Sequence, residues 1–270
     1  ALIPWELMRD RPMLNLHLLR SRNFALSCAL LTSLGIIMLG SVQIIPQLLQ
    51  EVLGYSAMDA GLVLTAGGAL ALVAMPIAGR LSGRVDARVL IGFGFFAQAV
   101  SLWQMGHLST QMSFYDAAVV RLVQSFGLPF LFVPINTVAY LGLAPEVNNQ
   151  ASAIMNMLRN LGGTIGISTM QTMLARGAQI HQSRLVEHLN PLNPNYVSAV
   201  GHLTHALSGL GSGARGAALG MLYRTMQGQA QMLAYIHVFY FFMVLALCML
   251  PLVLLMRTGR AGGAVAEIAL

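Results

Sequence analysis

The sequence has little charge. Only 9% of its 270 residues are Asp, Glu, Lys or Arg, against about 25% in ordinary soluble domains. All fifteen basic residues are arginine, so lysine is absent. A large soluble helical bundle would need more charged side chains than this to cover its surface, so the composition disfavours that alternative and favours a membrane protein.

Cysteine and metal-ligating clusters are also scarce. The two cysteines, Cys28 and Cys248, lie in separate apolar runs without metal-ligand spacing, and we expect them to be packing residues. His202 and His205 have i, i+3 spacing but no further ligand nearby. No paired carboxylates, nucleophile with a base, or basic stripe with aromatics occurs in the apolar runs. The sequence therefore predicts no metal, no cofactor, no enzyme activity and no nucleic-acid partner.

The apolar residues, 56% of the chain, are gathered in long blocks. A helix needs about 20 apolar residues to cross a bilayer. Four runs contain no charged residue and two contain one arginine each: Phe24–Leu49, Ala60–Gly79, Val89–Leu108, Ala234–Met256, Ala117–Leu143 and Ala151–Ala175. We predict an all-α integral membrane protein with six transmembrane helices.

The arginines between the runs predict orientation. They cluster before the first run, between the second and third, and after the sixth: Arg9, Arg11, Arg20, Arg22, Arg80, Arg84, Arg88, Arg257 and Arg260. Arginine-rich connections stay in the cytoplasm, so both ends of the chain are predicted to be cytoplasmic. The net charge of +6 follows from this topology.

The predicted organisation has five parts. They are a cytoplasmic lead-in (1–22), helices one to five (23–176), an extended periplasmic loop (177–229), the sixth helix (230–257) and a cytoplasmic tail (258–270). We expect the fifth helix to project to near His188 before a turn at the two prolines of "NPLNPN". A connection of this length is typically functional, and docking of a partner outside the membrane is our hypothesis for it.

One arginine interrupts the fifth run near its centre. Arg159 in "NMLRNLGGTIG" lies about 15 Å along the predicted helix, near the bilayer midplane, where lipid exposure is costly. Asn156, Arg159 and Gly163 share a face, while Gly162 and Gly166 form a small-xxx-small pair for close helix packing. Arg159 either caps carbonyls or pairs with an acid, or it borders a water-filled substrate cavity.

Two further features of the predicted helices concern bends and buried charge. Pro46, Pro129 and Pro134 are expected to bend the first and fourth helices. Arg121 lies about seven residues into the fourth helix, and Asp116 is too poorly placed along that helix to be its partner.

Several motifs resemble one transporter family. "WELMRDRPMLNLHLLRSRNF", "IPQLLQEVLGYSAMDAGL", "RLVQSFGLPFLFVP" and "NMLRNLGGTIGIS" occur in the order found in the last six helices of fourteen-helix drug:proton antiporters of the EmrB/QacA type, in the major facilitator superfamily. The likeness covers nearly the whole chain. Asn15 stands where the family usually has an acidic residue, and in "GRLSGRVDAR" Gly83 replaces the aspartate of the superfamily's cytoplasmic loop.

The resemblance implies half of a transporter, with a preceding N-terminal half as its partner. It implies export of hydrophobic or amphipathic toxicants in exchange for protons, in a bacterial inner membrane, with a periplasmic adaptor and an outer-membrane channel. The implied cavity residues are Gln43, Gln47, Gln124, Asn136, Asn156 and Arg159. Those implied to be structural or gating are Pro46, Gly79, Arg84, Arg88, Arg121, Pro129, Pro134, Gly162, Gly163 and Gly166.

One alternative function remains: a membrane scaffold or receptor that transports nothing. Such a protein would have little reason to place an arginine at the midplane beside proline-bent helices. The sequence therefore favours transport over this alternative. The carboxylates that would titrate in proton coupling are absent from the interior of the six runs.

Overall fold

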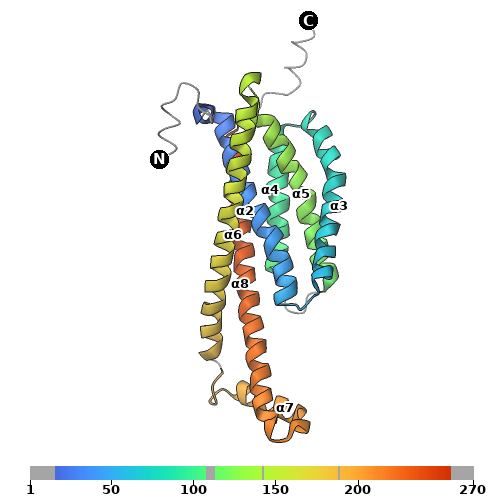
Figure 1. Cartoon of the computed structure of the whole chain (residues 1–270), viewed down its shortest axis with the longest axis vertical. Helices are drawn as coiled ribbons and strands as arrows, with labels where there is room; N and C mark the ends of the chain where they lie inside the picture. Colours follow the sequence, from blue (N-terminus) through green and yellow to red (C-terminus); the bar gives the residue numbers. More distant parts are fainter. Residues whose placement is uncertain (1–15, 108–112, 142, 188, 257–270) are drawn as a thin grey trace.

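The computed structural model describes residues 16–107, 113–141, 143–187 and 189–256, and Figure 1 shows them as a bundle of long helices. Within these ranges there is no strand, which confirms the predicted all-α fold. In chain order the elements are η1 (Leu16–Arg20), α2 (Arg22–Glu51), α3 (Ala57–Ser82), α4 (Ala87–Gly106), α5 (Phe114–Ala139), η2 (Pro145–Val147), α6 (Asn148–Glu187), α7 (Pro194–Ala206), η3 (Ser208–Gly213) and α8 (Ala214–Leu254).

Polar caps fix where the shorter helices begin. The Ser56 hydroxyl accepts a hydrogen bond from the Asp59 amide at 3.2 Å, and the Asp86 carboxylate accepts one from the Arg88 amide at 2.9 Å. Ser113 forms a capping box at the start of α5. These side chains satisfy amide groups that a helix start leaves without partners, so short polar links suffice between α2, α3, α4 and α5.

The long helices form two layers. One layer contains α6, α2, α5 and α3, in which α2 packs against both α6 and α5, and α3 packs against α5. The second layer contains α8 and α4: α8 packs on α6 and α2, and α4 on α5 and α8. The core between the layers includes four phenylalanines that are fully buried, Phe24, Phe95, Phe239 and Phe242.

The contact between α2 and α6 depends on glycine. A Cβ atom at Gly162 would lie 2.2 Å from the carbonyl oxygen of Thr32, and one at Gly166 would lie 2.4 Å from that of Ile36. On the α2 side, a Cβ at Gly35 would lie 2.1 Å from the carbonyl oxygen of Arg159. The absence of side chains therefore lets the two backbones approach closely, as membrane helices do at small-residue interfaces.

Five of the described helices are long and apolar enough to cross a membrane: α2, α3, α4, α5 and the helix that ends at Leu254. They correspond to five of the six predicted spans. The sixth predicted span lies in α6, which has 40 residues and so exceeds the required length. It falls outside this apolar set because one of its faces is polar, as described below.

The predicted extended loop, 177–229, is largely helical. α6 continues to Glu187, as expected of the projecting fifth helix, and α8 begins at Ala214, well before the predicted start of the sixth helix at 230. Helices of 40 and 41 residues are about 60 Å long, twice the roughly 30 Å of a bilayer core. We call residues 176–187 of α6 and 214–229 of α8 the stalk; α7 lies at its tip (Figure 1).

Parts of the predicted lead-in and tail lie outside the described residues. These are 1–15 and 257–270, which include four of the arginines used to predict orientation: Arg9, Arg11, Arg257 and Arg260.

Candidate substrate-facing surface

The exposed face of α6 carries a line of polar side chains. Asn156, Asn160, Thr164, Ser168 and Thr172 recur every fourth residue and are all exposed. At about 1.5 Å per residue this polar stripe is about 24 Å long, most of the thickness of a bilayer core. The opposite face of the helix is buried against α2. The stripe explains why α6 is less apolar than the other spanning helices.

Several stripe residues satisfy their donors locally. The Thr164 hydroxyl donates to the carbonyl of Asn160 at 3.1 Å, and the Thr172 hydroxyl to that of Ser168 at 2.8 Å. Asn156 Nδ2 donates to the carbonyl of Ser152 at 3.0 Å. These bonds leave hydroxyl and amide oxygens as acceptors on the surface, which suits contact with water or a polar partner better than contact with lipid tails.

Arg159 lies beside this stripe and is half-buried. Its guanidinium carbon lies 5.3 Å from the centre of the Phe132 ring on α5, a cation–π distance. α2 packs against both α5 and α6, and the Arg159 side chain reaches from α6 to this ring on α5. Among the described residues, no carboxylate and no backbone carbonyl accepts a hydrogen bond from it, so neither the capping nor the ion-pair interpretation is realised there.

Two other candidate residues lie on the same layer. Asn136 on α5 is half-buried, and its Nδ2 donates to the carbonyl of Phe132 at 2.6 Å, next to the ring that Arg159 covers. Gln43 on α2 is exposed. Together with Asn156 and Arg159 they give α2, α5 and α6 polar groups on or near the surface.

Gln124 lies elsewhere, inside the bundle. It is buried, and its Oε1 accepts a hydrogen bond from the Arg121 guanidinium. Its backbone carbonyl accepts a hydrogen bond from Gln98 Nε2 at 2.8 Å, which ties α4 to α5. The arginine is buried too and packs where a Cβ at Gly67 of α3 would lie 3.0 Å from its Cγ. The structure therefore does not bring Gln124 to the surface beside Arg159.

Gln47 belongs to a third polar group, near the end of α2. Its Nε2 donates to both carboxylate oxygens of Glu51 at 3.2 Å, and its Oε1 accepts from Gln171 of α6 at 3.2 Å. Tyr235 of α8 donates to Glu51 at 3.3 Å. No role is predicted from the sequence for Glu51, Gln171 or Tyr235, because these residues are far apart in the chain and meet only when α2, α6 and α8 pack.

The prolines and the cytoplasmic-loop motif occupy different environments. Pro129 and Pro134 are buried in α5 and Pro46 is half-buried in α2, and both helices continue past them. Gly79 and Arg84 are exposed. Arg88 donates to the carbonyl of Met256 and so connects the start of α4 to the end of α8.

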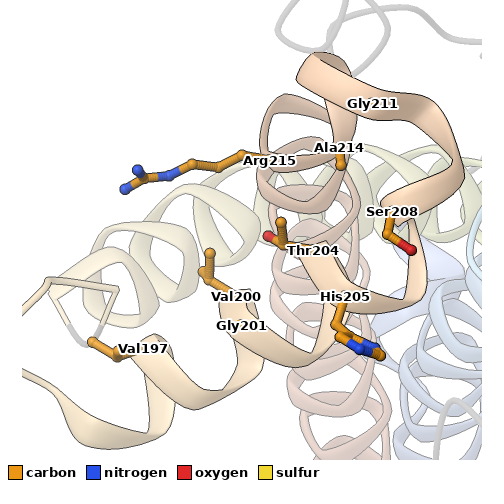
Figure 2. Close-up of a pocket in the computed structure, with 9 residues that line it drawn as sticks. All are labelled: Val197, Val200, Gly201, Thr204, His205, Ser208, Gly211, Ala214 and Arg215. Carbon is orange, nitrogen blue, oxygen red and sulfur yellow. The ribbon is translucent and has the colours of Figure 1, made fainter.

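The stalk has its own polar contacts and a groove at its tip. Within the stalk, Gln182 of α6 donates to the Tyr223 hydroxyl of α8 at 3.1 Å; one residue earlier in α6, His181 Nε2 lies 3.0 Å from Nδ1 of His237, a residue of α8 beyond the stalk. A groove of about 580 Å³ lies between α7, η3 and α8, with Val197 and Val200 on one side and Arg215 on another (Figure 2). Within the described ranges, no three metal-ligating side chains gather in one place.

These observations define a class of protein: a multi-pass membrane protein whose helical bundle presents a polar, arginine-bearing surface along α6. A family model described as the Major Facilitator Superfamily matches residues 1–167. The chain belongs to this superfamily, which confirms the resemblance seen in its motifs.

Named relatives support a narrower likeness. The chain is similar to the multidrug export protein EmrB of Escherichia coli K12, with 37% identity over 72% of this chain and 38% of that protein. It is 38% identical to EmrB of Haemophilus influenzae over the same shares. The fatty acid resistance protein FarB of Neisseria gonorrhoeae is 27% identical over 94% of this chain and 49% of its own length. The chain thus spans less than half the length of these relatives, two of which are named as multidrug export proteins.

Proposed function

We propose that this chain is the C-terminal half of a multidrug exporter that works by alternating access. Its polar surface would meet a second, N-terminal half, and the two halves would rock about a shared path for hydrophobic or amphipathic toxicants. The relatives named for multidrug export and fatty acid resistance support this class of substrate.

The observation that carries the proposal is the surface formed by Arg159 and the polar stripe. The guanidinium of Arg159 has no acidic partner among the described residues, and the polar stripe beside it is about 24 Å long. Within a bilayer, contact between these groups and lipid would be unfavourable. The same groups are favourable against water or a polar substrate. The stripe therefore supports a water-filled interface with a second half.

Exchange with protons belongs to this proposal. Arg159 cannot carry the proton, because guanidinium stays charged throughout the physiological range. Its proposed role is to hold anionic groups of a substrate or to fix the charge of a carboxylate in the other half. The residues that load and release the proton would then lie in that half.

We also propose that the protein lies in a bacterial inner membrane with both ends of this chain in the cytoplasm. The stalk would then project into the periplasm and dock an adaptor that leads to an outer-membrane channel. The groove at the stalk tip and the exposed α7 support a docking role for this region.

Drug accumulation in cells that express the full-length protein tests the export proposal. We expect Arg159→Ala to raise accumulation by about fivefold or more and Arg159→Lys to restore part of the export, because lysine keeps the charge but loses the planar contact with Phe132. Arg80→Ala, an exposed arginine in the last turn of α3, is the matched control and should leave accumulation unchanged. Normal export by Arg159→Ala would contradict the assignment.

A further inference from the structure

We propose that the cleft bounded by the end of α2 and by α6 and α8 binds a primary ammonium group. This cleft, defined here as the Glu51 cleft, has a volume of about 210 Å³. Its polar lining comes from Gln47, Glu51, Gln171, Gln231 and Tyr235. The site is separate from the polar stripe and does not depend on whether the protein exports drugs.

The carboxylate of Glu51 supplies the negative charge of the cleft. Glu51 accepts hydrogen bonds from Gln47 and from Tyr235, and both of these donors are neutral. In the part of the chain that the structure describes, no arginine or histidine forms an ion pair with it. Gln47 and Tyr235 therefore orient the carboxylate of Glu51 without neutralising its negative charge, and this charge remains available to a cation.

Two glutamine side chains add hydrogen-bond acceptors beside the carboxylate of Glu51. Gln47 uses its Nε2 for Glu51 and its Oε1 for Gln171, so the two glutamines and the carboxylate form one chain of hydrogen bonds. The Oε1 atoms of Gln171 and Gln231 accept no hydrogen bond from a described residue. A primary ammonium has three N–H donors, which these two oxygens and the carboxylate of Glu51 can accept.

The rest of the lining of the cleft is aromatic and aliphatic. The Tyr235 ring is buried at 2% exposure and is held by its bond to Glu51, so its position is fixed. An aromatic ring attracts a nearby cation. Leu174, Ala178 and Ala234 supply apolar surface beside the polar groups. This combination suits an amphipathic amine with a small hydrocarbon body, since drug-sized pockets are usually larger, about 300 to 1,000 Å³.

A binding measurement on the purified full-length protein in lipid nanodiscs tests the site. The probe is 1-naphthylmethylamine, a cation at about pH 7, and the neutral comparison is 1-naphthalenemethanol, which has nearly the same shape. We expect the wild type to bind the amine, and Glu51→Gln to bind it at least about tenfold more weakly. Glu146→Gln, an exposed carboxylate on η2, is the matched control and should bind as the wild type does.

Two results would overturn the proposal. One is that Glu51→Gln and the wild type bind the amine with equal affinity. The other is that Glu51→Gln weakens binding of the neutral alcohol as much as it weakens binding of the amine. The lipid composition of the nanodisc distinguishes two natural sources of the ammonium group, a lipid headgroup and a soluble amine. If phosphatidylethanolamine in the nanodisc lowers amine affinity relative to phosphatidylcholine, the natural occupant is a lipid headgroup; if it does not, the occupant is a soluble amine. Because binding is measured without transport, failure of the site leaves the export proposal untouched.

Discussion

At the residue scale, two arginines of the helical bundle lie in different surroundings and therefore have different roles. Arg159 and Arg121 both interrupt predicted spans, yet the first lies half-buried on an aromatic ring and the second is buried against Gln124. Arg159 is therefore placed to act on a ligand or on a second half. Arg121 packs against α3 at Gly67 and hydrogen-bonds to Gln124 within α5, while the Gln124 backbone carbonyl accepts the bond from Gln98 that ties α4 to α5.

Gly162 gives a direct test of the α2–α6 contact. In Gly162→Ala the new methyl would lie 2.2 Å from the Thr32 carbonyl oxygen, which belongs to the backbone and cannot rotate away. The helices must move apart, and we expect a loss of about 1–3 kcal/mol in the free energy of unfolding. Thermal unfolding in detergent measures it.

Gly220→Ala is the control for that variant. Gly220 also lies within a helix, but a Cβ there meets no atom within 4 Å. Alanine should stabilise the helix at this position by about 0.5–1 kcal/mol, because glycine loses more conformational freedom on folding. A similar melting temperature for both variants would show that α6 does not approach α2 as closely as described.

At the element scale, the sequence predicted the bundle well and the stalk poorly. The boundaries of α2 to α5 lie within about four residues of the apolar runs, because charged and capping residues occur close to the ends of these spans. The early start of α8 was missed because residues 214–229 contain two arginines, and a search for uncharged runs finds bilayer crossings rather than helices. A helix that continues beyond the membrane has no such signal.

The candidate surface was also only partly predictable. Arg159 and Asn156 are conspicuous in an apolar run, and the glycines beside them predicted close helix packing. The polar stripe was missed although its fourfold spacing is visible in the sequence, because its residues are uncharged and so do not interrupt a run that is defined by the absence of charge. The Glu51 cleft could not be found at all, since its members come from three helices that only tertiary packing brings together.

The pairing of α6 with α8 at the base of the stalk can be tested by a disulfide. A Cβ at Gly177 would lie 3.0 Å from the Cβ of Ala234, and disulfides need about 3.5 to 4.5 Å, so a small movement suffices. With Cys28 and Cys248 replaced by alanine, Gly177→Cys with Ala234→Cys should oxidise spontaneously. After proteolysis within 207–213, the two fragments should then stay joined until reduced.

A second cysteine pair controls for random collisions. Gly228→Cys lies before Ala234 in α8, closer to the tip of the stalk, where a Cβ has no neighbour within 4 Å. Paired with Gly177→Cys it should not form a bridge. Bridging of both pairs to the same extent would indicate that α6 and α8 are not held in the described register.

At the scale of the whole molecule, the stalk and the polar surface point in two directions. In the proposed function the polar surface meets a second half within the membrane, and the groove at the stalk tip receives a partner outside it. Less than half the length of the named relatives is present in this chain, so we expect neither export nor a complete path from these residues alone.

Deletion of residues 190–213 tests the docking role of the stalk tip. The segment contains α7 and η3 and lies between the ends of α6 and α8, so a short Gly/Ser linker can replace it without shortening either helix. We expect co-purification with the adaptor to fall by about tenfold while the protein level in the membrane stays normal. An unchanged yield of adaptor would remove the docking proposal.

The central claim is that the polar stripe faces water shared with a second half. It is tested most directly by thiol accessibility in the full-length protein without Cys28 and Cys248. A charged methanethiosulfonate should modify Asn160→Cys at least about tenfold faster than Val244→Cys, which is also an exposed position but lies on the apolar surface of α8, because only the thiolate in water reacts. Equally slow modification of both cysteines would place the stripe against lipid and contradict the account.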